Sequence, residues 1–441
     1  MVSGTRTGGI PEFLRSYTIQ NAVIDVTSSP LTFRSNIWLT IWLTVAAFST
    51  YFCMYAFRKP FTAGTFDGQT LWGMDYKIIL VVAQVFGYAA SKGIGIKVIS
   101  ETRPHQRAGR ILLLIGLAEI ALIFFGWVPA PYNWIFLFFN GLPLGMVYGL
   151  VFGFLEGRRI TDLLGAGLCL SFIMASGMVK SVGVWVLHQG VSEYWMPALV
   201  GALFLPLLGI SVWMLRVSPG PTVKDQEARR ERVPMSAEDR RVFFRSIAPG
   251  LVSLVAIYVL VSILRDVRDN FAVEIWRELG VSAPAVFSIT ESWVGGIVTV
   301  LVGLLFLVKN NRLAFWGNLW FVGAGIALIP VGTWLFQEGQ ISPLVWMIAV
   351  GLGIYLAYVP FNGMLFERLI AVRGERANVG FLFYVADFAG YLGSVSILLF
   401  RNFGNAGLSW LRFYIRFSYV VPVVSVGLLV FAWLYFRRKV G

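Results

Sequence analysis

Two segments of the chain place a tyrosine and an arginine seven residues apart inside long apolar runs. Tyr51 precedes Arg58 in the first segment, Tyr258 precedes Arg265 in the second, and both residues recur at an offset of 207. On a helix, residues seven apart lie on one face, so each tyrosine is two turns from its arginine. A guanidinium can bind a phosphate or carboxylate group through two parallel hydrogen bonds. The repeat therefore predicts a central anion site shared by two related halves.

A simpler interpretation is open for the first segment. Arg58 and Lys59 directly precede Pro60, and they could flank a membrane helix with their long side chains reaching the interface. From Ile37 to Arg58 the chain covers about 30 Å at ~1.5 Å per residue, which is enough to span the hydrocarbon. The second copy favours the anion site, because an interfacial flank has no reason to recur at a fixed offset.

The composition is that of a polytopic membrane protein. Of 441 residues, 57% are hydrophobic and only 13% are charged, and the mean hydropathy is +0.73. The net charge of +13 comes from basic residues between apolar runs, so topology explains it better than nucleic-acid binding does. The two cysteines, Cys53 and Cys169, stand in apolar runs, and there are two histidines. We expect no disulfide, no metal site and no cofactor.

Twelve apolar runs of about 20 residues each predict an all-α membrane protein with two pseudo-symmetric bundles of six helices. The runs are continuous rather than alternating, which favours helices over a β-barrel. They cover residues 37–60, 76–99, 110–129, 133–156, 163–187, 195–216, 247–268, 284–308, 313–336, 342–366, 378–400 and 416–436.

Polar segments divide the chain into four parts. We expect an N-terminal cytoplasmic tail at 1–35 without a cleavable signal, a first bundle at 36–216, a cytoplasmic linker at 217–246 and a second bundle at 247–441. Arginine and lysine gather mainly after even-numbered runs, which predicts that both termini are cytoplasmic. We expect a multi-pass monomer in a bacterial inner (plasma) membrane, with the lipid bilayer and a small anion as its partners.

Further charges lie inside the apolar runs, where they are costly and therefore usually functional. Lys92 and Lys180 lie deep in the second and fifth runs. Glu291 and Asp387 could balance a bound cation, carry a proton or neutralise the paired arginines. Asp269 follows Arg265 by four residues, so a local ion pair within the helix is an open alternative.

Acids beside arginines mark the predicted cytoplasmic ends of two runs. We expect these residues to form structural ion pairs that close an intracellular gate, with direct substrate contact as the alternative. They are Glu156, Arg158, Glu367 and Arg368. Glu119, in the third run, has no predicted role. The sequence shows no nucleophile beside a base, no HExxH and no phosphate-binding P-loop, so we expect no enzymatic activity.

The six-plus-six arrangement resembles the major facilitator superfamily, and several motifs are similar to its organophosphate:phosphate antiporter branch. The fourth-helix Gly-Trp-Pro-Pro motif of that branch is absent, and Ser176 stands near the place of its fifth-helix histidine, which indicates a divergent member. The matching features are Tyr51-x3-Tyr55-x2-Arg58-Lys59 with Phe61, Tyr88-x2-Ser91-Lys92, Arg265, Glu291 and Gly390-Tyr-Leu-Gly393.

The resemblance implies that Arg58 and Arg265 grip a phosphate from two sides, with Lys92 and tyrosines around it. The expected substrate-binding set is Tyr51, Tyr55, Arg58, Lys59, Tyr88, Lys92, Lys180, Tyr258 and Arg265.

We therefore expect a secondary transporter of a small phosphorylated or carboxylated anion that works by alternating access, in exchange for phosphate or with protons. Two alternatives stay open. One is a transport-like anion sensor, which would need a separate signalling partner. The other is a membrane-embedded lipid-modifying enzyme, which would form product without moving solute.

The basic residues after even-numbered runs yield a topology prediction. Tags at either terminus or within 217–246 should be accessible from the cytoplasm only. Labelling of either terminal tag from outside intact cells would contradict this orientation.

Overall fold

Long helices form where the apolar runs were predicted. The computed structural model describes residues 36–155, 161–221, 237–373, 379–404 and 407–440. The long helices of the first half are α2 (Asn36–Ala56), α3 (Tyr76–Ser100), α4 (Arg107–Trp127), α5 (Trp134–Leu155), α6 (Thr161–His188) and α7 (Met196–Arg216). Those of the second half are α9 (Ala237–Asn270), α11 (Ala285–Phe306), α12 (Asn311–Gln337), α13 (Pro343–Gly363), α15 (Val379–Gly404) and α16 (Trp410–Val440).

Short elements connect these helices. They are the 3₁₀ helices η1 (Pro60–Ala63) and η2 (Pro104–Gln106), the antiparallel strands β1 (Thr70–Leu71) and β2 (Met74–Asp75), and the helices α10 (Ala272–Glu278) and α14 (Leu365–Arg373). The two strands pair Thr70 with Asp75 and Leu71 with Met74.

The predicted twelve-helix membrane fold is confirmed. Among the described residues, eleven helical stretches are long and apolar enough to cross a membrane, and α15 occupies the position of the eleventh predicted run. Two boundaries differ from the prediction. Helix α9 begins at Ala237, inside the expected linker. Helix α2 ends at Ala56, because Pro60, four residues later, has no backbone N–H to donate to the carbonyl of Ala56.

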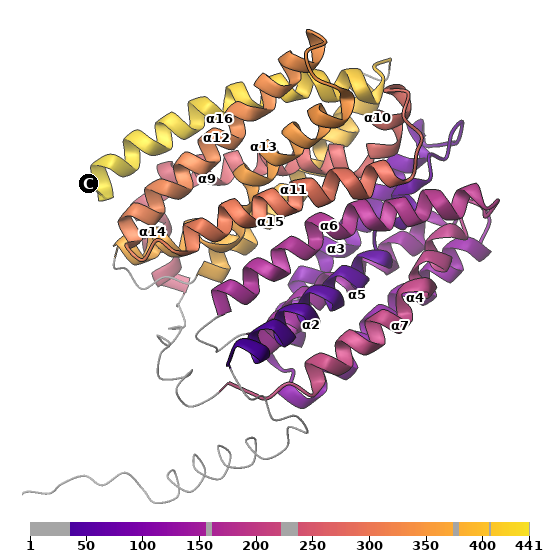
Figure 1. Ribbon diagram of the computed structural model, residues 1–441, viewed down its shortest axis with the longest axis horizontal. Coiled ribbons are helices and arrows are strands. Elements are labelled where there is room, and N and C mark those ends of the chain that lie inside the picture. The colour runs from indigo at the N-terminus through magenta and orange to yellow at the C-terminus, as the bar shows by residue number, and fades with distance from the viewer. Residues whose placement is uncertain (1–35, 156–160, 222–236, 374–378, 405–406, 441) are drawn as a thin grey trace, which may run out of the picture.

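Figure 1 shows the helices as two bundles, α2 to α7 in one and α9 to α16 in the other, with their axes running across the view. The start of α2, the end of α16 and α14 lie at one end, which we call the tail side. The β1–β2 hairpin and α10 lie at the opposite end, the hairpin side.

Small residues bring the halves together along α6 and α11. A Cβ atom added at Gly177 would lie 2.4 Å from the backbone oxygen of Phe287 and 2.5 Å from Cγ of Glu291. The backbone N–H of Ser288 also donates to Ser181 Oγ at 3.0 Å. Glycine at such a position permits the close helix contact on which packing inside membranes depends.

On the hairpin side, ion pairs connect the halves. Lys77 Nζ lies 2.5 Å from Glu274 Oε1, and both side chains are buried. Arg401 Nη1 lies 2.7 Å from Asp75 Oδ2. Together these contacts fasten the outer ends of α3 and the hairpin to α10 and α15.

A third pair on this side is exposed. Arg277 Nη1 lies 2.7 Å from Asp67 Oδ2, and its hydrogen bonding lowers the pKa of Asp67. Because both side chains are largely in solvent, this pair should add little to stability.

The α6–α11 contact can be tested by adding side-chain volume. Gly177→Val should lower the free energy of unfolding by about 1–3 kcal/mol, because the new methyl groups would overlap Phe287 and Glu291. Thermal unfolding of the purified protein measures the effect. Gly296→Val on α11 is the matched control, since a Cβ there meets no atom within 4 Å. Equal melting temperatures for the two variants would show that the contact is not tight.

Candidate anion site between the two halves

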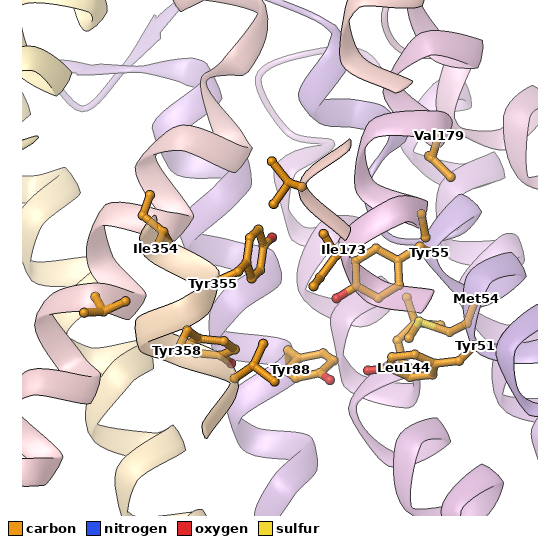
Figure 2. Packing of buried hydrophobic residues seen from close by; sticks show 14 of the residues in the cluster. Tyr51, Met54, Tyr55, Tyr88, Leu144, Ile173, Val179, Ile354, Tyr355 and Tyr358 are labelled. Carbon is orange, nitrogen blue, oxygen red and sulfur yellow. The ribbon is translucent and has the colours of Figure 1, made fainter. Parts of the chain in front are cut away.

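A pocket lies between the halves, and side chains from both line it. Aromatic side chains form much of its wall, and charged side chains of both signs lie among them. Figure 2 shows Tyr51 and Tyr55 of the first half and Tyr355 and Tyr358 of the second projecting toward Tyr88 and the space between the bundles. The lining comprises Tyr51, Tyr55, Arg58, Lys59, Val85, Tyr88, Lys92, Tyr148, Phe172, Ser176, Arg265, Asp266, Asp269, Asn270, Tyr355, Tyr358, Asp387 and Tyr391.

The end of α2 is what brings Arg58 and Lys59 into the pocket. Unwinding after Ala56 leaves backbone carbonyls that cannot complete the helical pattern. Asn140 Nδ2 donates to the carbonyl of Phe57 at 2.9 Å, and Gln84 Nε2 donates to the carbonyl of Arg58 at 2.7 Å. These two buried amides, themselves hydrogen-bonded at 2.7 Å, fix the turn that directs both cations inward. The interfacial-flank interpretation is therefore wrong for this segment.

Arg58 is held by an aromatic ring rather than by an acid. Its Cζ lies 3.8 Å from the centre of the Tyr88 ring and 5.8 Å from that of Tyr55. Among the described residues it has no carboxylate partner, and its buried Nε has no hydrogen-bond acceptor. A ring face attracts a cation but does not neutralise it, so Arg58 keeps its charge available to an anion.

Arg265 occupies the related place in the second half. Its Cζ lies 4.2 Å from the centre of the Tyr358 ring. Its Nη2 and Nε lie 2.7 and 3.0 Å from Asp266 Oδ1, and Ser394 Oγ donates to the other carboxylate oxygen at 2.6 Å. The carboxylate paired with Arg265 is thus Asp266, not Asp269 as the local-pair alternative proposed.

Asp269 instead joins two lysines of the first half. Its Oδ2 lies 2.5 Å from Lys59 Nζ, and its Oδ1 contacts Lys180 Nζ and accepts a hydrogen bond from Ser176. Lys59 also donates to Asn270 Oδ1 at 2.8 Å. One carboxylate facing two ammonium groups leaves this cluster with one excess positive charge.

Asp387 joins α15 to α3. Its Oδ2 lies 3.2 Å from Lys92 Nζ, and its Oδ1 accepts a hydrogen bond from Tyr258 at 2.9 Å. Tyr258 stacks on Tyr358 with ring centres 5.1 Å apart. Tyr258, predicted to bind substrate, therefore lies behind the pocket wall and orients Asp387 and Tyr358 instead. Lys180 is likewise outside the lining and acts on it through Asp269.

Glu291 has a partner of its own. Arg268 Nη1 lies 2.5 Å from Glu291 Oε1, and Arg268 Nη2 donates to the carbonyl of Met347 at 3.1 Å. The expectation that Glu291 neutralises Arg58 and Arg265 is therefore wrong in this arrangement. Its Oε2 is buried and has no hydrogen-bond partner, which leaves a role in proton coupling as a prediction.

Two of the four predicted gate residues lie in the part of the chain that the structure describes. Glu156 and Arg158 lie outside the described residues. Glu367 is exposed, and Arg368 donates to Asn311 of the same half at 2.5 Å. The gate therefore stays a prediction. Glu119 lies away from the pocket, with its Oε2 beside Gly201 and without a hydrogen-bond partner.

Several lining residues were missed by sequence reasoning. Tyr148, Tyr355 and Tyr358 resemble ordinary interface or packing tyrosines in an apolar run. Tyr391 follows Asp387 by four residues, so helical spacing from a known charge could have found it. Asp266 directly follows Arg265, and helical spacing gave no signal for it.

The charges around the pocket do not balance. The cations Arg58, Lys59, Lys92, Lys180 and Arg265 outnumber the carboxylates of Asp266, Asp269 and Asp387 by two. No three His, Cys, Asp or Glu side chains gather as a metal site in the part of the chain that the structure describes. The surroundings of the pocket therefore carry an excess of positive charge.

Comparison with known sequences shows the family. The profile of a family of unknown function, DUF5690, matches residues 60–439. The chain belongs to this family. No curated protein sequence matches it significantly.

Comparison with solved structures shows the fold. A D-xylose–proton symporter matches with a TM-score of 0.60 at 13% identity, covering 91% of this chain and 98% of the symporter. The nucleoside transporter NupG matches with a TM-score of 0.59 at 15% identity, covering 89% and 98%. The POT family transporter PepTSo matches with a TM-score of 0.58 at 13% identity, covering 92% and 99%. The chain thus has the fold of major facilitator superfamily transporters; the matches do not single out the organophosphate antiporter branch.

The lysine pair around Asp269 gives a stability prediction. Asp269→Asn should lower the free energy of unfolding by about 3–5 kcal/mol, because it leaves two buried ammonium groups facing each other. Asp67→Asn removes the same charge from the exposed pair with Arg277 and should lower it by under about 1 kcal/mol. Chemical denaturation in detergent measures both. Similar values for the two variants would show that the cluster is hydrated and not buried.

Proposed function

We propose that this protein is a secondary transporter of a small organic anion that carries a phosphate or carboxylate group. The observation that carries the proposal is the unneutralised guanidinium of Arg58, which lines a pocket between two halves of a transporter fold. A cation enclosed in a membrane protein without a carboxylate partner is unfavourable. A bound anion removes this penalty and would stabilise the folded state.

The second arginine supports the same ligand class. Arg58 and Arg265 come from opposite halves, and each lies against a tyrosine ring that holds its guanidinium plane. A ring face does not occupy the N–H groups of a guanidinium, so Arg58 can donate a fork of hydrogen bonds to phosphate or carboxylate. Arg265 can use the N–H groups that do not donate to Asp266. An anion gripped by both arginines would connect the halves, as alternating access requires.

The contacts between halves support movement of this kind. On the hairpin side, Lys77–Glu274 and Asp75–Arg401 hold the halves together, while Lys59 and Lys180 meet Asp269 beside the pocket. In alternating access these ion pairs separate when the pocket opens toward the hairpin side. The bound anion would then compensate the lysines that lose Asp269.

The arginines can be tested by changing geometry while keeping charge. Arg58→Lys and Arg265→Lys should each weaken anion binding about tenfold or more, because a charge-assisted contact contributes ~1.5–3 kcal/mol. The loss should be larger at Arg58, since Arg265 keeps part of its hydrogen bonding for Asp266. Thermal shift and calorimetric titration with inorganic phosphate, glycerol phosphate and succinate measure the affinities. The control is Arg412→Lys at an exposed site. Unchanged affinity in both pocket variants would remove the arginines from the site.

Transport itself requires a vectorial assay. Protein in liposomes should accumulate a radiolabelled anion when an imposed gradient of phosphate or of protons drives uptake. The gradient that supports accumulation identifies the coupled solute. Arg58→Lys liposomes are the matched negative control. Tight binding with no uptake under either gradient would contradict transport and favour a sensor, and a chemically altered solute would favour an enzyme.

A further inference from the structure

One ion pair of the pocket crosses between the halves, from α3 to α15, beside an aromatic contact between the same helices. Lys92 of α3 and Asp387 of α15 lie 3.2 Å apart, and their side chains are 19% and 11% exposed. One turn away along both helices, Tyr88 and Tyr391 meet edge to face with ring centres 5.6 Å apart. Because α3 runs from the hairpin side to the tail side, Lys92 lies nearer the tail side than Tyr88 does.

Lys92 stands beside the proposed anion anchor. Its Nζ lies 5.4 Å from the centre of the Tyr88 ring, the same ring that Arg58 covers at 3.8 Å. Two cations that adjoin one ring can reach the same small anion. In this structure, however, Lys92 forms an ion pair with Asp387.

Asp387 is able to release Lys92 at low cost. Tyr258 donates to its Oδ1 at 2.9 Å, and Tyr391 donates to its Oδ2 at 3.5 Å. A carboxylate that keeps two hydroxyl donors after losing its ion pair is not left as an orphan buried charge, which is the expensive case. The lysine, in turn, would exchange one carboxylate for the anion of the ligand.

We propose that Asp387 competes with the ligand for Lys92, and that an anion bound at Arg58 displaces Asp387 from this lysine. Lys92, released from Asp387, then completes the anion site from the tail side. Loss of the Lys92–Asp387 bond removes the ionic contact between α3 and α15 and leaves the aromatic contact of Tyr88 with Tyr391. Binding at the pocket is thereby coupled to separation of the halves there. This inference rests on the proposed anion site but adds a residue that opposes binding, which that proposal alone does not require.

The affinity test is a double-mutant cycle. Asp387→Asn keeps a side chain of the same shape for Tyr258 but removes the competing charge, so it should tighten binding of inorganic phosphate, glycerol phosphate or succinate by about three- to tenfold. In a Lys92→Gln background the same substitution should have no effect, because the lysine it releases is absent. Asp67→Asn, which makes the same charge change far from the pocket, controls for a general electrostatic gain.

The separation test uses distance. Spin labels at Ile94 of α3 and Val385 of α15, both exposed positions, would be introduced after replacing Cys53 and Cys169. The mean distance between the labels should increase in Asp387→Asn without ligand, and in the otherwise unaltered protein when phosphate is added.

The outcomes separate this inference from the proposed function. Weaker or unchanged anion binding in Asp387→Asn, or an equal gain in affinity in the Lys92→Gln background, would overturn the proposed competition by Asp387. Neither result would contradict the anion site itself. If no probe anion binds the unaltered protein, the proposed function fails and competition fails with it. An unchanged label distance in Asp387→Asn overturns the coupling to helix separation, whether or not the anions bind.

Discussion

A positive charge inside a membrane protein must be balanced, and the pocket of this protein does so incompletely: one carboxylate serves both Lys59 and Lys180, and none pairs with Arg58 in the part of the chain that the structure describes. The Arg58 guanidinium rests on Tyr88 without a carboxylate among the described residues. Neighbouring features maintain that situation. Helix α2 stops early, and Gln84 and Asn140 cap the freed carbonyls. A low-dielectric surrounding strengthens the attraction of such a charge for any anion that enters.

The two halves repeat this arrangement with a difference. Each places an arginine against a tyrosine ring, but Arg265 also has Asp266 beside it. The first half would therefore attract an anion more strongly than the second half, where Asp266 partly neutralises Arg265. An anion held between unequal sites can pass from one set of contacts to another as the halves move, whereas two equally strong grips would hold it in place.

Contacts between the halves differ along the membrane axis. On the hairpin side they are ionic contacts, of which Lys77–Glu274 is buried and Arg277–Asp67 is exposed. At α6 and α11 they are close backbone contacts that need Gly177. Near the tail side, the Lys92–Asp387 pair is more exposed than Lys77–Glu274, and its acid accepts hydrogen bonds from two tyrosines as well. Contacts that are easily exchanged at one end and firmly paired at the other suit a molecule that opens at one end at a time.

The sequence by itself determined the twelve helices, their division into two halves and the principal cations. Hydrophobic length is a local property, and the recurrence of Tyr51 with Arg58 as Tyr258 with Arg265 can be counted without a structure. The partners of those cations could not be read in the same way. Helical spacing suggested an ion pair between Asp269 and Arg265. In the folded chain Asp269 instead pairs with Lys59 and Lys180, which are distant in sequence. Only the folded chain decided that Glu291 pairs with Arg268, that Asp387 pairs with Lys92 and that Arg58 has no acid beside it among the described residues. These pairings depend on how helices that are separate in sequence face each other, both within one half and between the two.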